Sequence, residues 1–269
     1  MDKPTRPYKW LAPAAWVGVL AAGMLAAGGC GGVNTDYVTV ERLDRGLTIL
    51  LPGIEGEGML SYQVRSGLLR AGVDMALPIY QWGRPVPLAG PLLNQMDVAG
   101  NRTAAEQIAR MIVNYQDTHP DRPVYIVGHS GGGGVAVFSA EALPPGRMVD
   151  GLILLSASIS SGYDLSKALA RCRLGIVNFH SKGDVGLLVI GTTLVGNVDG
   201  GHGPAAGAIG FEDSFPGLHE VGWSPDMARA GNFGGHSGTC EPRFVSRYVA
   251  PWLDAAGWPA RSSTISLNR

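Results

Sequence analysis

The sequence predicts an α/β domain with a mostly parallel central sheet flanked by helices. Two patterns favour this class: short apolar runs typical of buried strands, and intervening stretches whose apolar residues recur at helical spacing. The 40 glycines do not indicate disorder, because they alternate with apolar runs such as 47–51 and 124–127. A chain of 269 residues suits one such domain once an N-terminal segment is set aside.

The expected strands are the short apolar runs. We place them near 37–42, 47–52, 74–80, 124–128, 151–156, 174–180 and 218–223. Because helical segments separate most of them, the connections should be of the βαβ type, which makes neighbouring strands parallel.

Three segments have the periodicity of amphipathic helices, and they begin at Thr103, Asp164 and Pro242. In the first, Thr103 and Glu106 form a capping-box pattern, and the helix ends before Pro120. The expected buried faces are Ile108, Met111, Ile112 and Tyr115 in the first helix, Leu165, Ala168, Leu169 and Cys172 in the second, and Phe244, Val245, Tyr248 and Trp252 in the third.

Two segments fit no element. Residues 83–100 are rich in proline and glycine, and residues 185–217 are rich in glycine and contain an apolar run. Each could line an acyl pocket, and the plainer alternatives are a surface loop for the first and a core helix for the second.

The charge balance excludes one class of partner. With 21 basic and 22 acidic residues the formal charge is −1, and no basic block lies beyond the extreme N-terminus. A nucleic-acid partner is therefore not expected, because its phosphates need clustered positive charge.

Residues 1–30 have the pattern of an export segment. Lysine and arginine side chains precede an uncharged run at 10–29 that ends in small residues. The run is long enough to span a bilayer core, and its positive flank would leave the following domain, residues 31–269, outside the cytoplasm. We expect an exported protein attached to the membrane, on the periplasmic or cell-surface side.

The stretch Leu25-Ala-Ala-Gly-Gly-Cys30 resembles a bacterial lipoprotein cleavage site, where the cysteine is acylated and becomes the new N-terminus. It departs from that pattern at Ala27, where leucine is usual. Lipidation at Cys30 is our expectation, and an uncleaved anchor helix or a plain cleaved signal are the alternatives.

Two cysteines, Cys172 and Cys240, remain in the exported domain. An oxidising compartment would permit a disulfide between them. The alternative is that both are small buried apolar residues.

The motif that carries chemistry is Gly128-His129-Ser130-Gly131-Gly132, which matches Gly-x-Ser-x-Gly. It directly follows the apolar run 124–127, and the residues after it can continue as a helix. This is the strand, sharp turn and helix of a nucleophile elbow, in which larger side chains two residues before or after the serine would collide with the crossing strand and helix.

A serine hydroxyl is a weak nucleophile, so it needs a histidine base and a carboxylate that orients that base. With the elbow and this requirement, residues 45–255 resemble the α/β-hydrolase family. The resemblance implies that fold, with at most a minimal lid, and it implies that serine, acid and histidine follow one another in the chain, each on a loop after a strand.

The resemblance assigns three catalytic residues: Ser130 as nucleophile, Asp184 as acid and His236 as base. Asp184 follows the expected strand 174–180, and His236 lies in a glycine-rich loop between the last expected strand and the last helix. The alternatives that stay open are Asp199 and Asp213 for the acid, and His219 and His202 for the base.

The tetrahedral intermediate of acyl transfer needs backbone donors for its oxyanion. The N–H of Gly131, directly after the serine, is the first. The family's second donor follows an early strand, and the segment Pro52-Gly53-Ile54 matches that place with proline where the family has histidine, so Ile54 is the second.

A metal centre is not favoured, because His180, Asp184, Asp199 and His202 show no recognised ligand spacing. No cofactor is expected. The expected activity is hydrolysis of an ester or thioester through an acyl-enzyme, on a small-molecule substrate.

Amidase, peptidase and acyltransferase chemistry could use the same machinery. A catalytically inert, membrane-anchored binding protein that keeps the fold is the alternative from another class. The expected apolar wall for the acyl group consists of Tyr80, Trp82, Leu92, Leu93 and Met96.

Overall fold

The computed structural model describes residues 32–83, 90–185 and 196–259. The predicted export segment with Cys30 lies outside the described residues, as does most of the apolar run that begins at Val185. Within the described ranges, no helix has both the length and the apolar character needed to cross a membrane.

A sheet of seven strands forms the centre of the domain, in the order β1-β3-β2-β4-β5-β6-β7. The strands are β1 (Val33–Asn34), β2 (Leu47–Leu51), β3 (Ile79–Tyr80), β4 (Val124–His129), β5 (Val149–Leu155), β6 (Cys172–His180) and β7 (Leu218–Gly222). In the described chain β1 alone pairs antiparallel with its neighbour, and the other pairings are parallel. The predicted fold class is confirmed.

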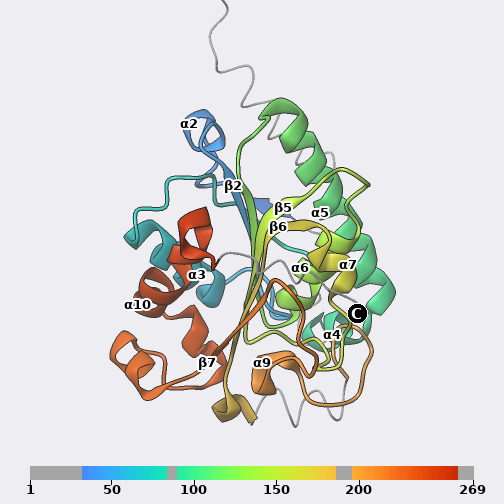
Figure 1. Cartoon of the computed structure of the whole chain (residues 1–269), viewed down its shortest axis with the longest axis vertical. Helices are drawn as coiled ribbons and strands as arrows, with labels where there is room; N and C mark the ends of the chain where they lie inside the picture. Colours follow the sequence, from blue (N-terminus) through green and yellow to red (C-terminus); the bar gives the residue numbers. More distant parts are fainter. Residues whose placement is uncertain (1–31, 84–89, 186–195, 260–269) are drawn as a thin grey trace, which may run out of the picture.

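Helices cover both faces of the sheet: α3 and α10 lie on one side, and α5, α6 and α7 on the other (Figure 1). The helices are α2 (Val40–Leu43), α3 (Met59–Arg70), α4 (Gly90–Met96), α5 (Val98–Thr118), α6 (Gly131–Glu141), α7 (Ser166–Leu169), α9 (Ala206–Ile209) and α10 (Pro242–Phe244). Short 3-10 and π turns also occur: η1 (Lys182–Val185), η2 (Pro225–Ala230), η3 (His236–Cys240), η4 (Val245–Val249), η5 (Ala250–Leu253) and η6 (Ala255–Gly257).

The central strands read as continuous apolar runs because both of their faces are buried. Val124 and Ile126 of β4 pack into the core beneath α5 and α6, whereas Tyr125 and Val127 pack into the core beneath α3 and the C-terminal helices. This alternation is the two-residue period of a strand, and two covered faces are typical of parallel sheets.

The prediction of a strand at 37–42 is wrong. Residues 40–43 form the one-turn helix α2 instead, because the Thr39 hydroxyl accepts the N–H of Arg42 at 3.3 Å and caps the turn. The Arg42 guanidinium also donates to the Met75 carbonyl at 2.9 Å, which ties the turn to the approach to β3. The strand predicted at 74–80 is shortened to Ile79–Tyr80.

The first predicted helix begins earlier than the sequence indicated. Asp97 caps α5, since its carboxylate accepts the N–H of Gly100 at 2.8 Å. Thr103 therefore lies inside the helix, where its hydroxyl donates to the carbonyl of Ala99 rather than capping an end. The predicted end before Pro120 is confirmed, and much of the unassigned segment 83–100 is helical.

The other two helix predictions are partly right. The second is shorter than predicted, since α7 covers Ser166–Leu169 and Cys172 already begins β6. The third starts at Pro242 as predicted, and it continues through η4 and η5 to Leu253.

Candidate active site

Ser130 lies at the turn between β4 and α6, with φ of 52° and ψ of −123°. This left-handed φ is uncommon for a residue other than glycine and marks stored backbone strain. Neighbouring strands hold the turn: the Ser130 N–H donates to the Leu155 carbonyl at 2.9 Å, and the Ser130 carbonyl accepts the N–H of Ser158 at 2.9 Å. The residue is 5% exposed, so the turn sits in a closely packed setting.

The two glycines that flank the serine by two positions are required by the packing. A Cβ on Gly128 would lie 2.4 Å from the carbonyl oxygen of Gly132, and a Cβ on Gly132 would lie 2.4 Å from the carbonyl oxygens of Leu51 and Pro52. These neighbours are backbone atoms and cannot move aside. The sharp turn predicted from the motif is therefore built on glycines for the steric reason that the sequence suggested.

Asp184 and His236 meet at the ends of two parallel strands. Asp184 lies in η1, directly after β6, and His236 opens η3 in the segment after β7. The Nδ1 of His236 is 2.8 Å from the Asp184 Oδ2, and the carboxylate is 2% exposed. A carboxylate can only accept, so it holds the proton on Nδ1 and leaves Nε2 as the basic nitrogen.

This pair lies beside the strained serine. The His236 ring centroid is 4.9 Å from the ring centroid of His129, the residue before Ser130. Within the described residues no hydrogen bond closes between the Ser130 hydroxyl and the imidazole, and bonds of this kind commonly tighten only when substrate binds. The structure thus brings the three predicted residues to one edge of the sheet.

The two predicted oxyanion donors are neighbours. Ile54 sits in the turn that the Gly56 N–H closes on the Gly53 carbonyl at 3.0 Å. A Cβ on Gly131 would lie 2.8 Å from the Ile54 Cγ2, so the turn and the start of α6 are in contact. Among the described hydrogen bonds none uses the N–H of Ile54 or Gly131 as donor, which leaves both amides for a ligand.

No family model matches the sequence, and no curated protein does. Solved structures do match. Lipase B from Aspergillus fumigatus superposes with a TM-score of 0.53 at 15% identity, covering 84% of this chain and 58% of the lipase. A CIB-like hydrolase from Thermoplasma acidophilum has a TM-score of 0.44 at 18% identity, covering 80% of this chain and 88% of that one. Acyl-protein thioesterase 2 from Zea mays has a TM-score of 0.41 at 14% identity, covering 84% of this chain and 100% of that one.

The chain has the α/β-hydrolase fold. At identities this low the likeness concerns the fold alone. Within this α/β-hydrolase fold, the serine turn follows β4, the acid follows β6 and the histidine follows β7, which is the chain order that the resemblance implied.

The α/β-hydrolase domain places the alternative acids and bases elsewhere. Asp199 accepts the N–H of Ser160 at 3.1 Å, and Asp213 is exposed. The His219 ring lies against Trp252 and Trp258, with centroid distances of 5.6 and 5.7 Å. His202 is exposed. None of these four contacts the Asp184–His236 pair through a described hydrogen bond.

The four residues considered as metal ligands, His180, Asp184, Asp199 and His202, do not come together as one site. His180 pairs with Glu220 at 3.5 Å, and Asp184 is engaged by His236. In the described part of the chain, no group of three or more histidine, cysteine, aspartate or glutamate residues could hold a metal ion. Cys172 and Cys240 are free and buried, so the alternative of two small core residues is the one that the structure has.

The predicted apolar wall is only partly at the site. Trp82 lies against Gly131, and its Nε1 donates to the Pro52 carbonyl at 2.7 Å. Tyr80 instead points to Gln107, with its hydroxyl 2.9 Å from the Oε1. Leu93 and Met96 are exposed, and the Leu92 side chain lies outside the described residues.

Sequence reasoning missed three residues that support the site. Asn94 of α4 donates to the Ile54 carbonyl at 3.1 Å and holds the turn at residues 53–56, which is called the oxyanion turn below after its proposed role. Glu55 and His129 form an ion pair, with Oε1 and Nδ1 3.8 Å apart. The one signal in the sequence was the position of Glu55 directly after Ile54, because a charged side chain there lies close to the predicted backbone donor.

The electrostatics of this pair are unusual. Burial would lower the pKa of His129, but the nearby Cys240 sulfur and the Glu55 carboxylate outweigh burial and hold this pKa well above the usual value. Burial would likewise raise the pKa of Glu55, yet His129 holds it below the ordinary range. Both shifts favour the charged forms.

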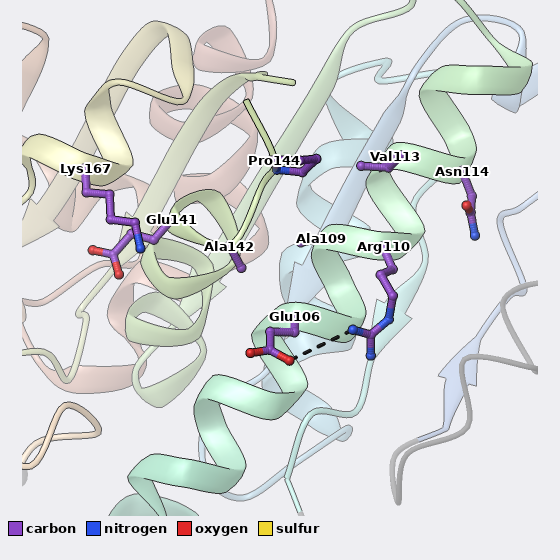
Figure 2. Close-up of a pocket in the computed structure, with 9 residues that line it drawn as sticks. All are labelled: Glu106, Ala109, Arg110, Val113, Asn114, Glu141, Ala142, Pro144 and Lys167. Atoms are coloured by element: carbon purple, nitrogen blue, oxygen red, sulfur yellow. Dashed lines mark ion pairs between the residues drawn. The ribbon is translucent and has the colours of Figure 1, made fainter. Parts of the chain in front are cut away.

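A separate hollow of about 580 Å³ lies between α5 and the C-terminal end of α6, with Lys167 of α7 beside it (Figure 2). Charges of both signs line it, including Glu106, Arg110, Glu141 and Lys167. Glu106 and Arg110 pair with each other at 4.0 Å. Its described lining contains no serine, cysteine or histidine, so it offers no nucleophile or base.

Proposed function

We propose that the chain is a serine hydrolase that cleaves an ester or thioester through an acyl-enzyme on Ser130. The observation that carries the proposal is the 2.8 Å contact between Asp184 and His236 beside a serine held at a φ of 52°. Strained backbone beside an oriented imidazole is the arrangement that activates a hydroxyl.

In the first half of the proposed reaction, the serine is acylated. The Nε2 of His236 removes the proton of the Ser130 hydroxyl while the Oγ attacks the substrate carbonyl. The carbonyl oxygen becomes an oxyanion and accepts the N–H groups of Gly131 and Ile54. His236 then passes the proton to the departing alcohol or thiol, and Asp184 remains ionised throughout.

The acyl-enzyme is released by the same groups in reverse roles. His236 takes a proton from water, the hydroxide attacks the acyl carbonyl, and the serine oxygen leaves with the proton from the imidazole. The Aspergillus fumigatus neighbour is named a lipase, which favours an ester as the first substrate to test.

A fluorophosphonate probe tests the proposal directly, because it reacts only with an activated serine. We expect the wild-type protein to be labelled and Ser130→Ala to be unlabelled. Ser139→Ala is the matched control, since Ser139 is buried in α6 and its hydroxyl is engaged by the Val135 carbonyl at 2.7 Å. An unlabelled wild type would contradict the proposal and favour the inert binding protein.

We also propose that residues 1–30 export the domain and that a lipid on Cys30 attaches it to the membrane. Strand β1 begins at Val33, three residues beyond Cys30, and three residues reach at most about 10 Å. Such a lipid would hold the domain close to the bilayer surface. Mass spectrometry of the protein from its native membrane should find an acylated Cys30, and an unmodified Cys30 would leave the anchor-helix or soluble forms.

A further inference from the structure

His129 contacts all three segments that carry the reacting groups. It precedes Ser130 at the end of β4, its Nδ1 is 3.8 Å from the carboxylate of Glu55, and its Nε2 is 3.3 Å from the backbone carbonyl of His236. Glu55 follows Ile54 in the oxyanion turn. The side chain is 4% exposed, so these contacts replace water almost completely.

The hydrogen-bond chemistry indicates which protons this ring carries. A backbone carbonyl can only accept, so Nε2 must hold a proton to bond to the His236 carbonyl. Nδ1 is buried and has no hydrogen-bond partner among the described residues, and its nearest charged neighbour is the Glu55 carboxylate. In a neutral ring the Nδ1 lone pair would face that carboxylate, whereas a second proton turns the contact into an attraction.

We propose that His129, as an imidazolium, is a positioning residue that holds the oxyanion turn and the segment carrying His236 against Ser130. The site is therefore fully active only while His129 is charged. This inference rests on the proposed hydrolase function. It identifies how pH regulates the same site, through a residue other than the acid and base.

The charged groups around His129 support this role. Glu55 faces it from the oxyanion turn, and His236 and Cys240 face it from η3, with Asp184 behind His236. The residues that face it from α3 and from β5, namely Ser61, Val64 and Leu155, carry no charge. Asp184 is balanced by His236 once that ring takes the serine proton, whereas Glu55, one residue from the Ile54 N–H, has His129 as its partner. A neutral His129 would leave the Glu55 charge uncompensated next to a donor that must bind an oxyanion.

The sign of the pH dependence follows from the direction of the shift. The pKa of His129 is raised, so the pair with Glu55 is complete below that pKa and is lost as the pH rises through it. Activity should therefore fall on the alkaline side, as the pH rises through the pKa of His129. Because the oxyanion forms only after the substrate has bound, in the transition state and the tetrahedral intermediate, the fall should appear in kcat rather than in KM.

The test is the pH profile of kcat for hydrolysis of p-nitrophenyl acetate. In Glu55→Gln the alkaline midpoint should move to lower pH by about one unit or more, because an opposite charge has been removed. In His129→Gln the alkaline fall should disappear, and kcat at neutral pH should be lower by about tenfold, with KM changed by less than about twofold. Glu55→Asp, which restores the charge, should recover most of the lost alkaline activity.

The matched control is His119→Gln. His119 is a partly buried histidine beside a carboxylate, with its Nε2 3.7 Å from Asp44, and it follows α5 at the opposite end of β4 from the serine turn. Its substitution should leave the profile unchanged. A wild-type profile in Glu55→Gln, or an alkaline fall that survives in His129→Gln, would overturn the inference.

A second measurement separates this inference from the proposed function. In the Ser130→Ala protein, which cannot turn over, the C2 proton of His129 can be titrated by NMR and assigned by its loss in His129→Gln. We expect its midpoint above that of a free imidazole, and lower once Glu55→Gln is added. Equal titration midpoints of His129 with and without Glu55 would refute the ion pair, even if the enzyme is active. A wild-type protein that shows the expected midpoints but is not labelled by the fluorophosphonate would refute only the hydrolase function.

Discussion

At the scale of single residues, the candidate site depends on the absence of a side chain at Gly132 as much as on the hydroxyl of Ser130. The end of β2 passes so close to the start of α6 that backbone oxygens occupy the space of any side chain at position 132. The proposed donors Gly131 and Ile54 belong to the same two segments. In the proposed mechanism, position 132 therefore affects both stability and catalysis.

Gly132→Ala should lower both. Its Cβ would lie 2.4 Å from the carbonyl oxygens of Leu51 and Pro52, and such overpacking costs about 1–3 kcal/mol of unfolding free energy. Thermal unfolding and the rate of fluorophosphonate labelling measure the two effects. Gly32→Ala is the control, because the residue is exposed and a Cβ there meets nothing within 4 Å, and it should change the stability by less than about 0.5 kcal/mol.

Asp184→Asn should nearly abolish labelling while leaving the fold intact. The amide keeps the shape of the side chain, but it neither holds the proton on Nδ1 of His236 nor balances the charge that His236 acquires. We expect the labelling rate to fall on the order of 10³ to 10⁴-fold. Asp199→Asn, which changes a carboxylate bonded to the Ser160 N–H, should label at the wild-type rate, and the reverse pattern would make Asp199 the acid.

At the scale of elements, the oxyanion turn is held from outside rather than by its own sequence. Trp82 donates to the Pro52 carbonyl from beyond β3, and Asn94 donates to the Ile54 carbonyl from α4. The turn itself closes with one backbone hydrogen bond, between Gly56 and Gly53. The position of the Ile54 N–H therefore depends on segments that are distant in the chain.

Trp82→Phe should loosen the turn without emptying the core. The ring remains against Gly131, but the 2.7 Å bond to Pro52 is lost, and we expect kcat to fall about 5 to 10-fold through poorer oxyanion placement. Trp258→Phe is the matched control. Trp258 is also 7% exposed, as Trp82 is, and it donates to a carbonyl at 2.8 Å on the far side of the domain. It should lose about 1 kcal/mol of stability and no activity, and a loss of kcat in Trp258→Phe would contradict local action of Trp82.

The elements show where sequence reasoning succeeds. The strands β2, β4 and β5 were predictable because both faces of each are buried, which makes them continuous apolar runs. The run at 37–42 has the same β-branched character, yet the Thr39 cap and the bond from Arg42 to Met75 make it helical. Strand propensity is weak against such tertiary contacts, and a single sequence does not reveal them.

The same distinction holds for the site. The tight turn at Ser130 was predictable because it imposes glycines on its neighbours, and the positions of Asp184 and His236 were predictable because each follows a strand in the order that the resemblance implied. Their catalytic roles stay predictions. The pairing of His129 with Glu55 could not, because it joins two loops whose separation only the folded sheet determines. The sequence shows His129 only as the variable position of the Gly-x-Ser-x-Gly motif, which does not indicate a partner for it.

At the scale of the whole molecule, the parallel sheet explains why residues far apart in the chain converge. The carboxyl ends of β2, β4, β6 and β7 lie on one edge, and the oxyanion turn, the serine, the acid and the base each follow one of them. A binding site at that edge is the general rule for open α/β sheets. Each group is therefore placed by a different strand, and the site exists only when the whole sheet is formed.

The free thiols offer a test of that cooperativity. Cys172 begins β6, whereas Cys240 lies in η3, in the segment that carries His236, and both are fully buried. If the domain unfolds as one unit, a thiol reagent should modify the two cysteines together, at the same denaturant concentration at which fluorophosphonate labelling is lost. Reductant should leave that midpoint unchanged, because no disulfide joins them. Modification of Cys240 at lower denaturant than Cys172 would instead show that the segment that carries His236 opens before the sheet does. A midpoint lowered by reductant would show that a disulfide joins the two cysteines in solution.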